Sequence, residues 1–313
     1  MSGLGRALLD LPGNVLVRGG GDEHYADGDD GSWRAVDWPA LTRTLRVAER
    51  DVNVVDSGGD GPPILFVHGL GGHWQNWLAT LPAFIGAHRV IAPDLPGFGR
   101  SPMPAGRISI PGYTRVLAQL CDALAVTAPI VVGNSMGGLI AADLAIAHPE
   151  LVRRLVLVDA AGLSIEGLWK EPLLTLARLL RLSSHGAAAA ASPLLRRPRL
   201  RRAVLQPFVR YPERLSGRLA GELIAGGEAP GLVGGLDAVL SYPIRDRVAA
   251  IVAPTLIVWG RNDVLVPVAD AAELERLIGA NARSLVFEDT GHLPMLERPS
   301  AFNALLADFI AEG

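Results

Sequence analysis

The residue best placed for chemistry is a serine within a short glycine-rich segment. Ser135 lies in Gly133-Asn134-Ser135-Met136-Gly137, between an apolar β-branched run and an Ala/Leu-rich helical pattern. This order predicts a strand, a sharp turn and a helix, with the serine hydroxyl exposed at the turn. The glycines permit the close backbone approach that such a turn needs. An ordinary strand–helix connection can carry the same G-x-S-x-G pattern, so the rest of the chain must decide its meaning.

Two further groups follow runs typical of buried strands. Asp263 and His292 each come shortly after an apolar run, late in the chain. Because ligands in open α/β sheets bind beyond the carboxyl ends of strands, we expect both side chains near Ser135. A serine hydroxyl needs an adjacent base, so His292 would take its proton while Asp263 orients the imidazole. Asp263 also has the chemistry of a plain turn residue, and Asp159, at another strand end, is the alternative acid.

A second glycine-rich turn, His68-Gly69-Leu70-Gly71, follows another apolar run. The backbone N–H groups of Leu70 and Met136 would form an oxyanion hole. They would stabilise the transition state by donating hydrogen bonds to the negative charge that develops on the substrate oxygen. We interpret His68 as structural, bonded to backbone within its turn. Further substrate contacts are expected from Gly69, His73, Trp74 and Asn134. For His73 and Trp74, packing within the loop is the alternative.

The composition argues against several classes of function. A net charge of −3 over 313 residues gives no electrostatic basis for binding nucleic acid. The single cysteine, Cys121, rules out an internal disulfide and lies in an amphipathic helical pattern typical of a packed core thiol. No apolar run approaches the roughly 18 to 20 residues that span a bilayer, and no signal-peptide pattern is found. We therefore expect a cytoplasmic protein without a membrane span. No metal-spaced Cys/His cluster appears.

Strand and helix patterns alternate along most of the chain. This alternation predicts a doubly wound, mostly parallel α/β sheet. The expected strands lie at about 45–48, 51–56, 64–67, 89–92, 129–132, 155–158, 255–259 and 284–287. The expected helices lie at about 112–126, 137–147, 268–278 and 299–311.

The chain divides into three parts by pattern. Residues 46–162 and 244–313 would form the α/β core. Residues 163–243 contain no strand pattern, and their Leu, Ala and Arg spacing predicts a helical insertion. Residues 1–45 form a poorly defined N-terminal arm, in which we find no chemistry, although Trp33 and Trp38 could pin part of it to the domain.

Together these motifs resemble those of the α/β-hydrolase superfamily over roughly residues 45–313. The segment around Ser135 is similar to the nucleophile elbow of that family, and the turn at Leu70 is similar to its oxyanion turn. The resemblance extends to the loop 94–101 and to the acid and base turns at 260–263 and 291–292. It implies an α/β-hydrolase fold in which residues 163–243 form the helical cap that sets substrate choice.

The resemblance and the triad support a serine hydrolase acting on a carboxylic ester through an acyl-enzyme on Ser135. The Leu and Ala content of the cap favours a small-molecule ester with an apolar acyl or alcohol part. The alternative is a meta-cleavage-type hydrolase that breaks a C–C bond in a vinylogous diketone. A third hypothesis is a small-molecule receptor that turns over slowly. A serine at this position argues against the family branches with an aspartate nucleophile, and no cofactor is expected.

A basic run in the insertion has two interpretations. Arg196-Arg197-Pro198-Arg199-Leu200-Arg201-Arg202 is typical of a solvated helix face balanced by acids elsewhere. The alternative is a contact with phosphate, a carrier or an anionic membrane. The sequence carries no signal of oligomeric state.

Overall fold

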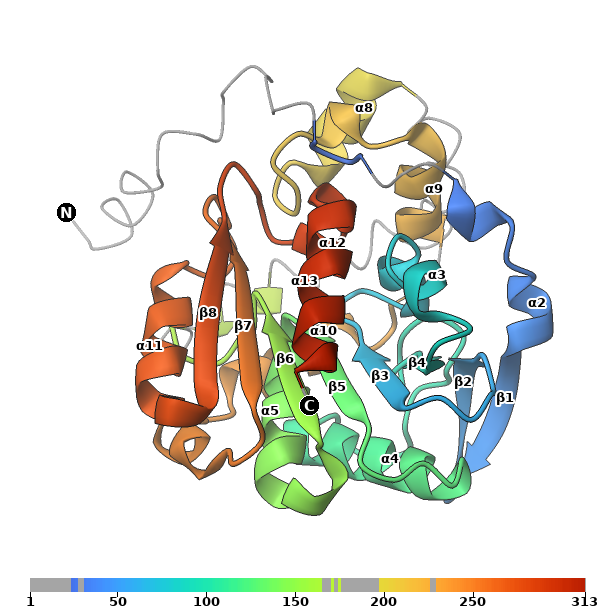
Figure 1. Cartoon of the computed structure of the whole chain (residues 1–313), viewed down its shortest axis with the longest axis vertical. Helices are drawn as coiled ribbons and strands as arrows, with labels where there is room; N and C mark the ends of the chain where they lie inside the picture. Colours follow the sequence, from blue (N-terminus) through green and yellow to red (C-terminus); the bar gives the residue numbers. More distant parts are fainter. Residues whose placement is uncertain are drawn as a thin grey trace.

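An eight-stranded sheet forms the centre of the computed structural model (Figure 1). The structure describes residues 24–27, 31–164, 170–171, 174–175, 197–225 and 229–312. Across the sheet the strands follow the order β1-β2-β4-β3-β5-β6-β7-β8, antiparallel at β1–β2 and β2–β4 and parallel from β4 onward. The strands are β1 (Thr42–Val47), β2 (Arg50–Asp56), β3 (Pro63–Val67), β4 (Arg89–Pro93), β5 (Ile130–Asn134), β6 (Arg154–Val158), β7 (Thr255–Gly260) and β8 (Ala282–Phe287).

The predicted fold class and every predicted strand are confirmed. The runs could be located because parallel strands covered on both faces are apolar throughout, and β5 and β7 are buried along their whole length. β1 begins at Thr42, so it crosses the expected boundary between the arm and the core. The helix expected from about 112 begins at Ile110, because Pro111 is accommodated in its first turn.

Alternate residues of each strand feed two apolar cores, one on each face of the sheet. Leu65 and Val67 face one core with α4 (Ile110–Ala123), α5 (Met136–Ala147) and α11 (Ala269–Ile278). Ile64 and Phe66 face the other core, which α3 (Leu81–Phe84) and α13 (Pro299–Ala311) cover. Burial at roughly 25 cal/mol per Å² of apolar surface makes this double layer the main stabilising term. Cys121 belongs to the first core, as predicted, and burial raises its pKa to about 12.

The described part of residues 163–243 is helical and without strands. It contains α8 (Pro198–Leu205), α9 (Gly217–Ala225) and α10 (Leu232–Leu240). In Figure 1, α8 and α9 lie at the top of the view, above α12 and α3, on the side toward which the arrowheads of β7 and β8 point. α10 is tied to the core where Gly231 N–H donates to the carbonyl of Gly97 at 2.8 Å. The insertion therefore lies next to the sheet edge where ligands bind in such folds.

The described part of the N-terminal arm packs on the core. Trp33 is buried, and the Trp38 ring lies 5.0 Å from the Trp74 ring between centroids. Both tryptophans thus pin the arm as expected. Tyr25 is 3% exposed and contributes to the site described below. None of the described helices is long and apolar enough to cross a bilayer.

The end of β7 leaves no room for a side chain. A Cβ at Gly260 would overlap the carbonyl oxygen of Gly291, one residue before His292. We expect Gly260→Ala to force these two loops apart and to lower the free energy of unfolding by about 1–3 kcal/mol, as overpacking does. Urea denaturation measures this change. Gly106→Ala is the matched control, because a Cβ there meets nothing within 4 Å. Equal stability of the two variants would contradict the close approach.

Candidate active site

Ser135 occupies a strained turn between β5 and α5. Its backbone has φ 57° and ψ −120°, a conformation that side-chain-bearing residues rarely adopt and that functional sites retain at an energetic cost. Ser135 N–H donates to the carbonyl of Val158 at 3.0 Å, which anchors the turn to β6. A Cβ at Gly133 would overlap the carbonyl of Gly137, so the glycines on either side of the turn are required. The predicted strand, sharp turn and helix are all present, and Ser135 keeps partial exposure among buried neighbours.

Asp263 and His292 form a buried hydrogen-bonded pair. His292 Nδ1 lies 2.7 Å from Asp263 Oδ2. The other carboxylate oxygen, Oδ1, accepts from the N–H groups of Leu265 and Val266 at 2.7 and 3.1 Å. Because an ionised carboxylate can only accept, Nδ1 carries the hydrogen in this arrangement and Nε2 keeps its lone pair. The imidazole is thereby oriented with its basic nitrogen available to a neighbouring hydroxyl.

Asn134 joins the serine turn to the histidine loop. Its amide nitrogen donates to the carbonyl of Val158 at 3.1 Å and to the carbonyl of His292 at 3.2 Å. On the other side, a Cβ at Gly69 would lie 3.0 Å from Ser135 Cβ. The segments that carry Ser135, His292 and the Gly69 turn therefore meet at one edge of the sheet. The Asn134 side chain bonds the serine turn to the histidine loop and to the end of β6.

The two expected oxyanion donors lie on either side of this junction. Met136 is the first residue of α5, so its N–H has no partner one helical turn earlier. The turn of Leu70 is fixed by His68, whose Nε2 accepts from Leu95 N–H at 2.9 Å and whose Nδ1 lies 2.8 Å from Gly69 O. His68 is thus structural, as predicted.

Three other singled-out residues are already engaged in packing. His73 Nε2 lies 3.1 Å from the carbonyl of Leu223, and Trp74 is buried beside Trp38. Asp94 accepts from the N–H groups of Trp74 and Arg100, both at 2.9 Å, and so ties down its own loop. In this structure His73 and Trp74 therefore join the core to α9 and to the arm.

The alternative acid, Asp159, lies directly behind the pair. It is fully buried at the end of β6, and Gly260 N–H donates to its Oδ1 at 3.0 Å. In the described part of the chain, one group of His, Cys, Asp and Glu side chains is close enough to share a cation. It consists of Asp159, Asp263 and His292, with one atom from each within 4.8 Å of the others. The 2.7 Å hydrogen bond already uses the facing atoms of Asp263 and His292, so we interpret the group as an acid–base pair with a second carboxyl behind it.

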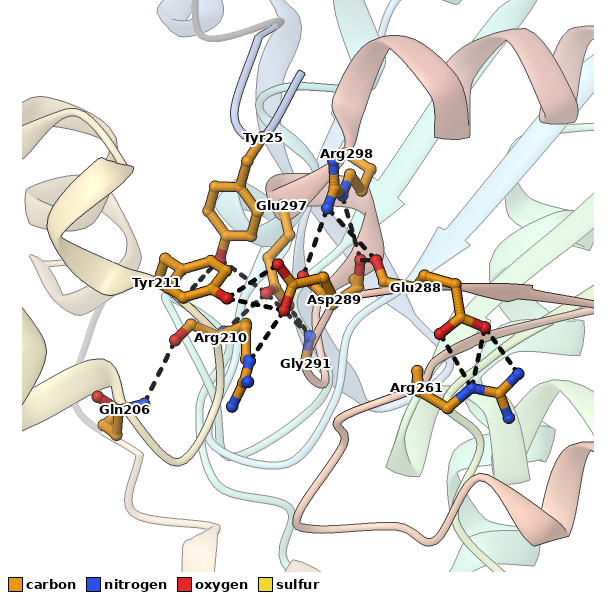
Figure 2. A network of polar contacts seen from close by, with 11 residues as sticks. Tyr25, Gln206, Arg210, Tyr211, Arg261, Glu288, Asp289, Gly291, Glu297 and Arg298 are labelled. Carbon is orange, nitrogen blue, oxygen red and sulfur yellow. Dashed lines mark hydrogen bonds and ion pairs between the residues drawn. The ribbon is translucent and has the colours of Figure 1, made fainter. Parts of the chain in front are cut away.

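A buried glutamate that the sequence analysis missed holds the histidine loop. Glu297, in α12 (Pro294–Glu297), accepts from Gly291 N–H and Leu293 N–H, the residues on either side of His292, at distances of 2.9 to 3.1 Å. It also accepts from the Tyr25 hydroxyl at 2.7 Å (Figure 2). Burial raises the pKa of Glu297, although these donors favour its charged form. Its position five residues after His292 was the available signal.

The same carboxylate reaches the helical insertion. Arg210 N–H donates to Glu297 at 2.7 Å, and Arg210 Nε and the Tyr211 hydroxyl both bond to Asp289 (Figure 2). His292 N–H donates to the carbonyl of Phe208 at 2.9 Å. The insertion, the arm and the histidine loop are therefore joined through one network.

The basic run divides into exposed and engaged arginines. Arg197 and Arg199 are exposed at the start of α8, whereas Arg201 is buried and donates to the carbonyls of Pro212 and Glu213. Arg202 pairs with Gln206 and lies 3.9 Å from Glu213. Arg196 lies outside the described residues.

Comparison with known proteins identifies the class. The family model described as the alpha/beta hydrolase fold matches residues 62–299. The chain belongs to this family, and it is a hydrolase. It is 32% identical over 292 residues to a 2-hydroxymuconate semialdehyde hydrolase of Pseudomonas sp. (strain CF600), covering 88% of this chain and 95% of the relative.

Relatives with other substrates are similarly close. Lipase 1 of Psychrobacter immobilis is 33% identical over 269 residues, which cover 82% of this chain and 79% of the lipase. Among solved structures, a mutant of a meta-cleavage product hydrolase from Pseudomonas fluorescens superposes with a TM-score of 0.68 at 25% identity, covering 87% of this chain and 98% of that one. The comparisons therefore establish the family and leave both ester and C–C chemistry open.

His68 makes a testable contribution to pH dependence. Burial lowers its pKa from 6.5 to about 4, because the charged form loses its hydration. Protonation would also cost Nε2 its bond from Leu95 N–H. The unfolded chain binds this proton near pH 6.5 and the folded chain only near pH 4. Stability should therefore fall as pH drops through this window, by up to about 1.4 kcal/mol per pH unit. Urea midpoints at several pH values measure the slope. His68→Gln, which does not titrate, should lose this part of the slope, and equal slopes would refute the assignment.

Proposed function

We propose that the chain is a serine hydrolase that cleaves a carboxylic ester through an acyl-enzyme on Ser135. The observation that carries the proposal is the buried hydrogen bond between Asp263 and His292, at the sheet edge that also carries a strained, partly exposed serine. An unactivated serine is a weak nucleophile and needs a base. The His292 imidazole, oriented by Asp263, would be that base.

The proposed reaction assigns one role to each group at this edge of the sheet. Ser135 Oγ attacks the carbonyl carbon while His292 Nε2 takes its proton, and the Asp263 carboxylate stabilises the imidazolium. The C–O bond then breaks as the leaving alcohol takes this proton. Water then attacks the acyl carbon while His292 Nε2 takes one of its protons. The bond from this carbon to Ser135 Oγ breaks, Oγ takes the proton back from His292, and the acid is released. The N–H groups of Leu70 and Met136 would stabilise the oxyanion in both steps, each contributing about a hundredfold or more in rate.

The apolar surroundings of the oxyanion turn favour a substrate with an apolar part. A Cβ at Gly235 in α10 would lie 2.7 Å from Leu70, 3.1 Å from Phe98 and 3.4 Å from Met136. These three side chains meet under the insertion and contribute apolar surface beside the proposed donors. Ligand sites of this kind bury hydrocarbon and use few polar groups for orientation.

C–C bond hydrolysis is the second candidate, and the comparisons supply its support. The 2-hydroxymuconate semialdehyde hydrolase covers this chain nearly end to end, and another relative, from Comamonas testosteroni, acts on 2-hydroxy-6-oxo-6-phenylhexa-2,4-dienoate by its name. A dienoate is anionic and needs a partner for its carboxylate. The three side chains that meet at Gly235, those of Leu70, Phe98 and Met136, offer no such partner, so we place ester hydrolysis first.

Replacing the nucleophile tests the proposal. Ser135→Ala should lower kcat for p-nitrophenyl esters by about 10⁴ to 10⁶-fold, as removal of a triad nucleophile does, and should abolish fluorophosphonate labelling. Ser300→Ala is the control, because Ser300 is exposed at the start of α13. Labelling of Ser135→Ala at the wild-type level would show that another residue is the nucleophile.

A substrate comparison separates the two candidates. We expect wild-type enzyme to turn over a chain-length series of p-nitrophenyl esters with a preference for longer acyl chains, because the walls beside the donors are apolar. A vinylogous diketone dienoate, followed by loss of its absorbance, should react at least about tenfold less efficiently in kcat/KM, which corresponds to roughly 1.4 kcal/mol. The reverse preference would assign the chain to C–C bond hydrolysis.

A further inference from the structure

A second carboxyl group has no role in the mechanism above. Asp159 is 0% exposed, and its backbone φ of 44° turns the chain sharply at the end of β6. Its Oδ1 accepts from Gly260 N–H at 3.0 Å, whereas Oδ2 is buried without a hydrogen-bond donor. An unsatisfied buried polar atom is costly and calls for an explanation.

The environment of Asp159 cannot accommodate another negative charge. The titratable groups that face it in the described chain are Asp263 at the end of β7, His292 in the loop after β8, and Glu297 in α12. Two of these three are acids. Burial, first, and then the charges of Asp263 and Glu297 raise the pKa of Asp159 well above its usual range.

The two neighbouring aspartates are unequally supplied with donors. Asp263 accepts three hydrogen bonds, from Leu265, Val266 and His292, whereas Asp159 accepts one from Gly260. Donors stabilise an ionised carboxylate, so charge belongs on Asp263. If the pair shares one proton, that proton belongs on the unpartnered oxygen of Asp159.

We propose that Asp159 is protonated and donates a hydrogen bond from Oδ2 to the Asp263 carboxylate, as a positioning residue that holds the acid of the triad in line with His292. The inference rests on the proposed function, because Asp159 acts through Asp263 and touches no substrate. The bond satisfies the orphaned oxygen, and it removes the repulsion between two buried acids.

Three variants test the proton. Asp159→Asn keeps a donor and is neutral, so the acid limb of kcat/KM against pH, which reports His292 in the free enzyme, should stay within about 0.3 pH units of wild type. Its kcat should fall by no more than about threefold, because an amide is the weaker donor. Asp159→Ala lacks the donor and should lose about ten- to a hundredfold in kcat/KM, as misplaced catalytic groups do. Asp143→Asn is the matched control, since it neutralises another buried carboxylate, 3.0 Å from Arg247, and should leave the limb in place.

The outcomes are distinct. If Asp159 is an anion in the wild type, Asp159→Asn removes a negative charge near the imidazole and the acid limb moves down by about one pH unit or more. That shift would overturn the proposal, as would wild-type kinetics of Asp159→Ala. A metal ion found by elemental analysis, or a limb that moves on treatment with EDTA, would also overturn it, because a cation would then hold the two carboxylates.

A folding measurement covers the case in which Asp159→Ala does not fold. A proton held only in the folded state stabilises the wild type less as pH rises. The urea midpoint of wild type should therefore fall relative to that of Asp159→Asn between pH 5 and 8, and parallel midpoints would refute the proton. Fluorophosphonate labelling of wild type at Ser135 separates the two proposals. If wild type is labelled but the acid limb of Asp159→Asn is shifted, only the role of Asp159 is refuted. If wild type is not labelled, the proposed function is refuted.

Discussion

The structure depends on a carboxylate that accepts hydrogen bonds at a place where water cannot reach it. The Asp263 side chain is fully buried, and it bonds to His292 Nδ1 at 2.7 Å. A buried carboxylate loses its contacts with water, and this loss is costly unless hydrogen bonds replace them. Two N–H groups of its own turn, from Leu265 and Val266, offset that cost and also decide which oxygen faces the histidine. The local turn after β7 is therefore part of the chemistry and not only a connection.

The fold supplies the other half of this arrangement through close backbone contacts. β7 lies between β6 and β8, so the ends of these three strands bring Asp159, Asp263 and the histidine loop to the same edge. The contacts there are backbone to backbone, as at Gly260 against Gly291, and leave little freedom for either loop. Positioning catalytic groups within fractions of an ångström needs this kind of support.

The sequence could predict those features that depend on a few neighbouring residues. A buried strand and a glycine-flanked turn each have a pattern of a few consecutive residues. These patterns indicated the strands, the turn at Ser135 and the positions of Asp263 and His292. The choice between Asp263 and Asp159 was not local. Both end a strand, and only the contact with His292 in three dimensions distinguishes them.

The network around Glu297 was beyond sequence reasoning for the same reason. Tyr25 and Glu297 are 272 positions apart, and their contact depends on an arm whose composition indicated only a loop. A single tyrosine in such a segment has no periodicity to reveal its partner. Its ring also packs under Arg298 at 5.3 Å and against Tyr211 at 5.2 Å, so the site includes residues that no motif of the family would indicate.

The three buried acids at this edge, Asp159, Asp263 and Glu297, have all lost their contacts with water, and they differ in the hydrogen-bond donors that replace it. Glu297 accepts from four donors, on Gly291, Leu293, Arg210 and Tyr25, which favour its charged form, although burial raises its pKa. Asp263 accepts from two turn N–H groups and is hydrogen-bonded to an imidazole. Asp159 has one donor, and a third negative charge beside these two would have no compensation. The distribution of donors thus ranks the three groups as hydrogen-bond acceptors without reference to any substrate, and the carboxyl that faces the proposed base has more donors than the one behind it.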